Sequence, residues 1–114
     1  MITLYGIRNC DTMKKAFAWL DKEGIGYRFH DYKKEGVDRA RLTDWCQKAG
    51  WKVLVNTRGT TWRKLSPAEQ AVGTQADAIA LMLDNTSLIK RPVIEKGAQV
   101  HVGFDADALS QALK

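Results

Sequence analysis

Residues 1–32 follow a strand–helix–strand pattern, which limits the possible folds of this chain more than any other feature of its sequence. Residues 1–6 alternate in character, are rich in β-forming side chains and end at a glycine, as a strand does. Residues 12–23 repeat apolar side chains at helical spacing until Gly24 ends the pattern. Residues 27–32 alternate aromatic and polar side chains and indicate a second strand. Because strands joined through a helix run parallel in one sheet, we expect a βαβ unit here.

A mainly helical segment is predicted for residues 37–85. Its first helix begins at Asp38, a residue type that caps helices, and continues to about Gly50 with one apolar face. Residues 51–55 fit either a strand or a further helical turn, because periodicity does not separate the two over so short a run.

Polar connections are predicted at residues 33–36 and 56–65, where the apolar pattern is interrupted. Ser66 starts a short helix, because proline follows at the first helical position and Glu69 lies three residues after the cap. Residues 75–84 repeat apolar side chains at helical spacing and predict a further helix.

The C-terminal residues are predicted to complete the sheet. Residues 88–94 and 99–103 pair as a hairpin around a short turn that contains Gly97. Asp105 then caps a final helix with an apolar stripe. The resulting order is βαβ, a helical section and ββα, which is a thioredoxin-like α/β arrangement with a helical insert between its two halves.

The chain of 114 residues is long enough for one domain with a modest hydrophobic core. We therefore expect a single domain over residues 1–114, and a monomer. In this domain the thioredoxin-like core occupies about residues 1–35 and 86–114, and the helical insert about residues 37–85.

The formal net charge of +5 raises the question of a nucleic-acid partner. Basic residues are spread along the chain and interleaved with acidic ones, and no nucleic-acid-binding motif accompanies them, so we expect no such partner. A binding site for a small anionic ligand would account for part of the positive charge.

No apolar run is long enough to span a bilayer and the N-terminus lacks a signal-peptide pattern, so we expect a cytoplasmic protein without membrane association. The spacing of the cysteines and histidines predicts neither a disulfide framework nor a metal site.

Cys10 is the residue with the clearest chemical potential, because it lies where the first strand gives way to the first helix. We expect it in the first turn of that helix, where unpaired N–H groups and the positive end of the helix dipole converge. Such surroundings stabilise a thiolate, the reactive form of the thiol, and Arg8 adds positive charge nearby. Cys46 lies on an apolar helix face with Leu42 and Trp45, and we interpret it as core packing and not as a resolving cysteine.

Three blocks of sequence resemble the ArsC/Spx family, and most closely its YffB-type members. They are residues 4–12 (LYGIRNCDT), 56–65 (NTRGTTWRKL) and 88–92 (LIKRP), in the family's order and spacing. The resemblance implies a thioredoxin-like core with a helical insert, and a cis Pro92 that packs beside the reactive cysteine. In the arsenate reductases of this family the matching cysteine attacks arsenate, a glutathione thiol resolves the product, and glutaredoxin regenerates the enzyme.

The chain departs from the arsenate reductase pattern at the residues that bind the oxyanion. Those reductases surround arsenate with three arginines, and this chain has an arginine at only one of the three positions, Arg91. Asn56 stands at the second position, with Arg58 two residues later, and Val102 or its neighbours occupy the third. Since each charge-assisted hydrogen bond contributes about 1.5–3 kcal/mol, the loss of two predicts weak arsenate binding unless Arg8 and Arg58 substitute for the missing arginines.

The resemblance and these departures together predict a glutathione-dependent thiol–disulfide oxidoreductase that uses Cys10 as its single nucleophilic thiolate. Glutathione is the expected co-substrate and glutaredoxin a further expected partner, with no bound cofactor. The residues expected to bind substrate or glutathione are Arg8, Asn9, Thr12, Arg58, Arg91 and Pro92.

Two alternative functions remain open. Spx-type relatives act by contacting the α-subunit of RNA polymerase, and the chain would then be a non-catalytic binding module. Those relatives typically carry a CxxC redox switch, whereas residues 10–13 read Cys-Asp-Thr-Met here, which argues against the switch but not against the contact. The second alternative is a weak arsenate reductase.

Overall fold

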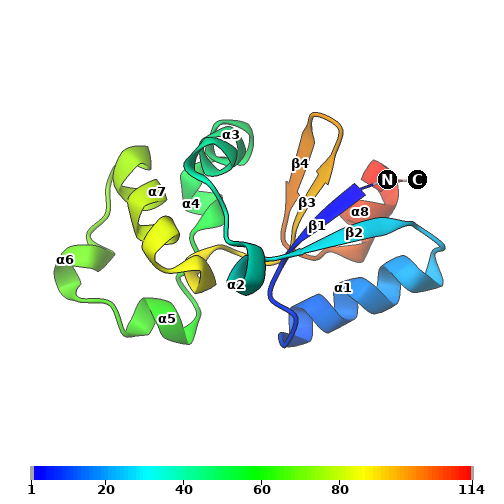
Figure 1. The fold of residues 1–114 in the computed structure, drawn as a ribbon, viewed down its shortest axis with the longest axis horizontal. Coiled ribbons are helices and arrows are strands. Elements are labelled where there is room, and N and C mark those ends of the chain that lie inside the picture. The colour runs from blue at the N-terminus through cyan, green and yellow to red at the C-terminus, as the bar shows by residue number, and fades with distance from the viewer. Residues whose placement is uncertain (1, 114) are drawn as a thin grey trace. The chain divides into compact units, whose positions relative to one another are not determined.

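The computed structural model describes residues 2–113, which divide into two compact units. The first unit is made of Met1–Glu35 and Arg91–Lys114, and the second of Gly36–Lys90. Figure 1 shows the strands in the first unit and a succession of short helices in the second. Among the described residues, no helix combines the length and the apolar character needed to cross a membrane.

The first unit is built on a four-stranded mixed sheet with the strand order β2-β1-β3-β4. β1 and β2 are parallel, whereas β3 is antiparallel to both β1 and β4. The parallel pair is joined through a helix, and the β3–β4 pair through a two-residue turn at which Gly97 has a positive φ. The strands are β1 (Ile2–Gly6), β2 (Tyr27–Asp31), β3 (Val93–Lys96) and β4 (Gln99–Val102).

Two helices of this unit, α1 (Asp11–Lys22) and α8 (Ala106–Leu113), bury their apolar stripes in one core together with alternate strand residues (Figure 1). The buried members of this core are Ile2, Leu4, Met13, Leu20, Ile94 and Leu109. Burial of each such side chain stabilises the fold by roughly 1.5–3 kcal/mol before entropy is counted. α1 ends at Lys22, and Gly24 follows with a φ of 69°, which lets the N–H of Ile25 turn back to the carbonyl of Leu20 at 3.0 Å.

The second unit is helical. Its longest elements, α3 and α7, pack against each other through buried apolar side chains that include Leu42, Trp45, Ile79 and Met82. Short helices and a 3-10 turn are the other elements of this unit. The elements are α3 (Arg39–Ala49), α4 (Trp51–Leu54), α5 (Thr60–Arg63), α6 (Pro67–Gln70), α7 (Gln75–Asp84) and the 3-10 turn η1 (Thr86–Leu88).

The helix caps form as the sequence predicts. The carboxylate of Asp38 accepts a hydrogen bond from the N–H of Arg41 at 2.7 Å, and α3 begins there. Ser66 and Glu69 make the reciprocal pair of bonds of a capping box, at 3.2 and 2.9 Å. Asp105 accepts from two N–H groups at the start of α8.

The thioredoxin-like α/β class is confirmed, and four local predictions need correction. The first strand of the hairpin is Val93–Lys96 and not residues 88–94, since Thr86–Leu88 form a 3-10 turn. Tyr32 does not extend the second strand, because the carboxylate of Asp31 accepts the N–H of Lys33 at 2.9 Å and starts the helical turn α2 (Tyr32–Glu35). The predicted connection at 33–36 is therefore mostly helical. The predicted irregular stretch at 56–65 likewise contains α5.

The ambiguous residues 51–55 are resolved as a helical turn followed by a short bridge. α4 ends at Leu54, and Val55 pairs with Ile89 in an isolated antiparallel bridge. Two backbone hydrogen bonds of 2.7 Å flank this pair, from Asn56 to Leu88 and from Lys90 to Leu54. The chain therefore uses both of the predicted conformations within a few residues.

Candidate functional site: a thiol at the start of α1

Cys10 lies at the end of the short loop that leaves β1, as the N-cap residue of α1. It was expected inside the first helical turn, and it stands one position earlier with extended backbone angles (φ −141°, ψ 132°). Its carbonyl accepts the N–H of Lys14 at 2.9 Å, so it still belongs to the hydrogen-bonded frame of the helix. The side chain is partly exposed and the thiol is free. The sulfur is therefore both held by a helix start and accessible to a reactant.

The surroundings of Cys10 lower the pKa of its thiol. Burial alone acts to raise this pKa, and hydrogen-bond donation from the N–H of Met13, the side chain of Arg91 and the N–H of Thr12 outweighs it. The positive charge of Arg91 acts in the same direction. A lowered pKa increases the fraction of reactive thiolate at neutral pH.

Arg91 reaches the thiol because of strand pairing. β3 pairs antiparallel with β1, and Tyr5 near the end of β1 lies opposite Val93 at the beginning of β3. The residues just before β3 are therefore placed beside the loop that just follows β1. The Arg91–Pro92 peptide bond is cis, as the family resemblance implied, and the Pro92 carbonyl accepts the N–H of Gly103 at 2.8 Å.

A buried tyrosine lies in the electrostatic neighbourhood of Arg91. Tyr32 is 1% exposed, and burial raises the pKa of its hydroxyl well above the ordinary value. Arg91 lowers the same pKa, while Tyr5 and Glu95 raise it. The Tyr5 hydroxyl also donates to Oε1 of Glu95 at 2.6 Å. No sequence pattern predicts this set, because Tyr5, Tyr32 and Glu95 lie in three separate segments whose proximity has no local signal.

The remaining predicted residues of the first unit take different places. Arg8 is exposed, and its guanidinium lies 5.0 Å from the ring centroid of Phe29, so Arg91 and not Arg8 is the cation that acts on the sulfur. Asn9 is exposed in the loop. Thr12 acts on the sulfur through its N–H, and its expected contact with substrate or glutathione stays a prediction.

Arg58 and Cys46 belong to the second unit. Arg58 is exposed, and its N–H donates to Oδ1 of Asn56 at 3.1 Å. Cys46 is 3% exposed on α3, and burial raises the pKa of its thiol. These features agree with the interpretation of Cys46 as a packing residue, since a buried thiol of raised pKa is a poor nucleophile.

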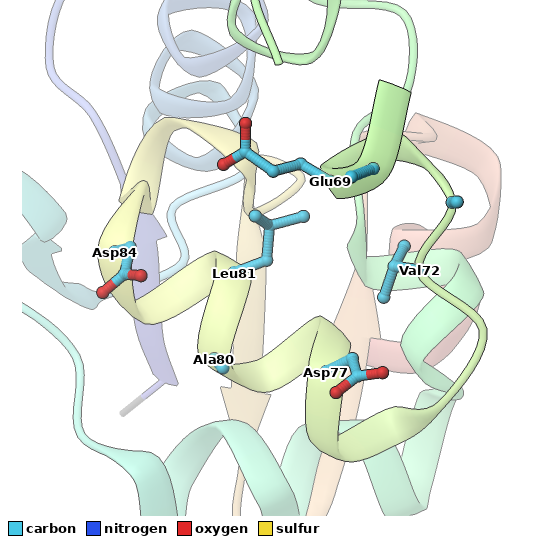
Figure 2. A pocket seen from close by; sticks show the side chains of 8 residues that line it. Glu69, Val72, Asp77, Ala80, Leu81 and Asp84 are labelled. Carbon is cyan, nitrogen blue, oxygen red and sulfur yellow. The ribbon is translucent and has the colours of Figure 1, made fainter. Parts of the chain in front are cut away.

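A hollow of about 340 Å³ between α6 and α7 contains none of the predicted site residues. Figure 2 shows Leu81 in the middle of this hollow, with the carboxylates of Glu69, Asp77 and Asp84 spread around it. Glu69 and Asp77 lie in first helical turns, where acidic side chains are favourable for the helix itself. In the part of the chain that the structure describes, no three His, Cys, Asp or Glu side chains are grouped as a metal site requires.

Comparison with known proteins agrees with this geometry. The model of the ArsC family matches residues 5–112, which is nearly the whole chain. The chain belongs to the ArsC family. Within that family, the solved structure of a YffB protein is 51% identical, with a TM-score of 0.96 and full coverage of both chains.

Two further relatives show the range of this ArsC-family fold. The solution structure of an arsenate reductase (ArsC) related protein from Brucella melitensis is 46% identical, with a TM-score of 0.78, and the match covers 98% of this chain and 92% of that one. The global transcriptional regulator Spx of Staphylococcus saprophyticus is 28% identical over 99% of this chain and 87% of its own length. The chain is therefore similar both to a reductase-related protein and to a regulator.

Proposed function

We propose that this ArsC-family protein is a glutathione-dependent thiol–disulfide oxidoreductase in which Cys10 is the only nucleophile. The observation that carries the proposal is the environment of Cys10, a partly exposed thiol at a helix start whose pKa is lowered by N–H groups and by Arg91. Thiolates in such electropositive, accessible positions are the reactive cysteines of oxidoreductases.

The first step is thiol–disulfide exchange. The Cys10 thiolate attacks one sulfur of a substrate disulfide, a bond forms between the two sulfurs, and the other substrate sulfur leaves as a thiolate that takes a proton from water. The donors that stabilise the Cys10 thiolate are the N–H of Met13, the side chain of Arg91 and the N–H of Thr12. The same donors would favour negative charge on a leaving sulfur held beside Cys10. The substrate is reduced at one sulfur, and Cys10 is held in a mixed disulfide.

The second step requires an external thiol. Cys46 is buried and its pKa is raised, and position 13 carries methionine in place of the second cysteine of a CxxC pair. Glutathione thiolate attacks the mixed disulfide, forms a new disulfide with the substrate-derived sulfur, and releases the Cys10 thiolate. Electrons balance over the two steps, because one disulfide is consumed and one is formed while glutathione is oxidised.

Alkylation of Cys10 by iodoacetamide at a series of pH values tests the first requirement. We expect the rate to follow a titration whose midpoint lies below about 8.5, the value of a free thiol. Cys10→Ser supplies the blank, and Cys46 provides an internal comparison because burial raises its pKa. A midpoint at or above that of a free thiol removes the basis of the proposal.

Incubation with oxidised glutathione, followed by intact-mass measurement and peptide mapping, tests the second requirement. We expect a single glutathione adduct, located on Cys10 and reversed by reduced glutathione. Equal labelling of Cys46, or no adduct at all, contradicts the mechanism. The same adduct gives a starting point for turnover assays with disulfide substrates.

The similarity to Spx supports a second candidate function, contact with the α-subunit of RNA polymerase. A pull-down with purified α-subunit, run beside a glutathione-dependent reductase assay, separates the two candidates. If Cys10→Ser retains the cellular phenotype and the α-subunit is bound, the binding function is favoured. If the variant loses both turnover and phenotype, the thiol function is favoured.

A further inference from the structure

A second hollow in the unit of residues 36–90 has a cationic lining. It has a volume of about 380 Å³, within the range of small-molecule sites. Lys52, Arg58 and Lys90 line it, and none of its lining residues is acidic. This lining is opposite in charge to that of the hollow between α6 and α7, which carries three carboxylates. The two hollows therefore differ in the charge of their linings.

The cationic residues are held together by backbone pairing. Lys52 and Arg58 lie on either side of Val55, and Lys90 follows Ile89. Val55 and Ile89 form the antiparallel bridge, and the N–H of Lys90 donates to the carbonyl of Leu54 at 2.7 Å. Backbone pairing between two segments that are distant in sequence therefore places the three cations around one hollow. No contact between their side chains is needed for this.

The loop that carries Arg58 is also fixed locally. Oδ1 of Asn56 accepts the N–H of Arg58 at 3.1 Å, in an Asx-type turn. Gly59 lies against the same amide, because a Cβ at this position would be 3.0 Å from Nδ2 of Asn56. The hollow therefore has a defined rim, formed by backbone bonds and a close glycine contact.

The charges in the hollow are not neutralised within the described residues. Arg58 and Lys90 have no carboxylate partner among residues 2–113, and Lys52 lies 5.7 Å from the ring centroid of Trp51. By contrast Lys48, on α3 of the same unit, is 3.1 Å from Oδ2 of Asp44. Cations gathered in one concave site without acidic neighbours repel each other and attract an anion.

The hollow also has an apolar wall. Val53 is 46% exposed, an unusual position for a large apolar side chain in this protein, and the buried Val55 lies beside it. A ligand that contacts this wall and the cations together combines negative charge with a short apolar frame. Inorganic anions satisfy only the first of these requirements.

We propose that the hollow lined by Lys52, Arg58 and Lys90 is a binding site for a small dianion, and that it binds without participation of the Cys10 thiol. The shared chemistry is two negative charges on a compact frame, as in a short dicarboxylate or a phosphate. The apolar wall at Val53 favours the dicarboxylate.

Titration of the ¹⁵N-labelled protein with succinate or with inorganic phosphate, at constant ionic strength set with sodium chloride, tests the site. We expect saturable chemical-shift changes at the amides of residues 56–58, with tighter binding of succinate. The double variant Arg58→Gln/Lys90→Gln should bind about tenfold more weakly or worse, because two charge-assisted contacts are lost. These side chains are exposed, so the variant should keep the wild-type spectrum elsewhere.

Two control variants decide the interpretation. Lys48→Gln removes one positive charge from the same unit outside the hollow, and should bind succinate like the wild type. Cys10→Ser should also bind normally. The proposal is overturned if neither anion gives saturable shifts, if Lys48→Gln loses as much affinity as the double variant, or if Cys10→Ser abolishes binding. Phosphate binding as tight as that of succinate would overturn the role given to Val53.

Discussion

Gly6, at the end of β1, is predicted to be intolerant of even one additional carbon atom. A Cβ built on this residue would lie 2.6 Å from Cε and 3.3 Å from Cγ of Met13, with the sulfur of Met13 closer still. Met13 is fully buried in the core beneath the sheet. The substitution Gly6→Ala must therefore displace a packed side chain three residues after Cys10.

The expected cost follows from overpacking of a buried site. Inserting a methyl group into a packed core costs about 1–3 kcal/mol, and the flexibility of methionine limits the cost without removing it. We expect Gly6→Ala to lower the free energy of unfolding by about 2 kcal/mol, and the melting temperature by roughly 6–10 °C. Urea denaturation followed by tryptophan fluorescence measures the change, since the chain contains four tryptophans.

Gly26 supplies the matched control, because a Cβ there would meet nothing within 4 Å and its φ lies outside the left-handed region. Gly26→Ala should change the stability by no more than about 0.5 kcal/mol. A double-mutant cycle with Met13→Ala gives a second control. Once the Met13 side chain has been removed, Gly6→Ala should cost nothing.

Two results would refute this reasoning. If Gly6→Ala and Gly26→Ala have equal effects, the contact with Met13 does not restrict the position. If Gly6→Ala costs the same in the Met13→Ala background, the cost comes from the backbone and not from the clash. A change in the slope of the denaturation curve would be a separate effect on the unfolded state.

Three further predictions concern single interactions. Arg91→Gln removes the guanidinium group, whose hydrogen bond and positive charge favour the Cys10 thiolate, so the midpoint of Cys10 alkylation should move to higher pH. An unchanged midpoint would exclude Arg91 from the thiol site. Tyr5→Phe removes the 2.6 Å hydrogen bond from the Tyr5 hydroxyl to Glu95, and should lower the free energy of unfolding by about 1–2 kcal/mol in urea denaturation. An unchanged free energy of unfolding would mean that water replaces the hydroxyl. Ser66→Ala removes the capping box and should cost about 1 kcal/mol, with no effect on alkylation of Cys10.

Local patterns were sufficient to predict most of the elements. The helices that begin at Asp38, Ser66 and Asp105 follow from cap residues whose hydrogen bonds are made within a few positions, and the structure contains each of these bonds. Residues 33–36 and 56–65 were predicted as irregular, and short helical turns occur in both. Such turns lack a repeating apolar face, so periodicity does not detect them.

The sequence by itself predicted the fold class of this protein and pointed to Cys10 as its candidate nucleophile. Both depend on neighbours in the chain: the strand–helix–strand order predicts a parallel pair, and a cysteine at a strand-to-helix junction meets free N–H groups. The tertiary structure decided which cation acts on the thiol. Arg8, the near neighbour in sequence, lies over Phe29, whereas Arg91 is brought to Cys10 by the pairing of β3 with β1. Pairing between distant strands depends on the whole sheet, and no local pattern in the sequence records it.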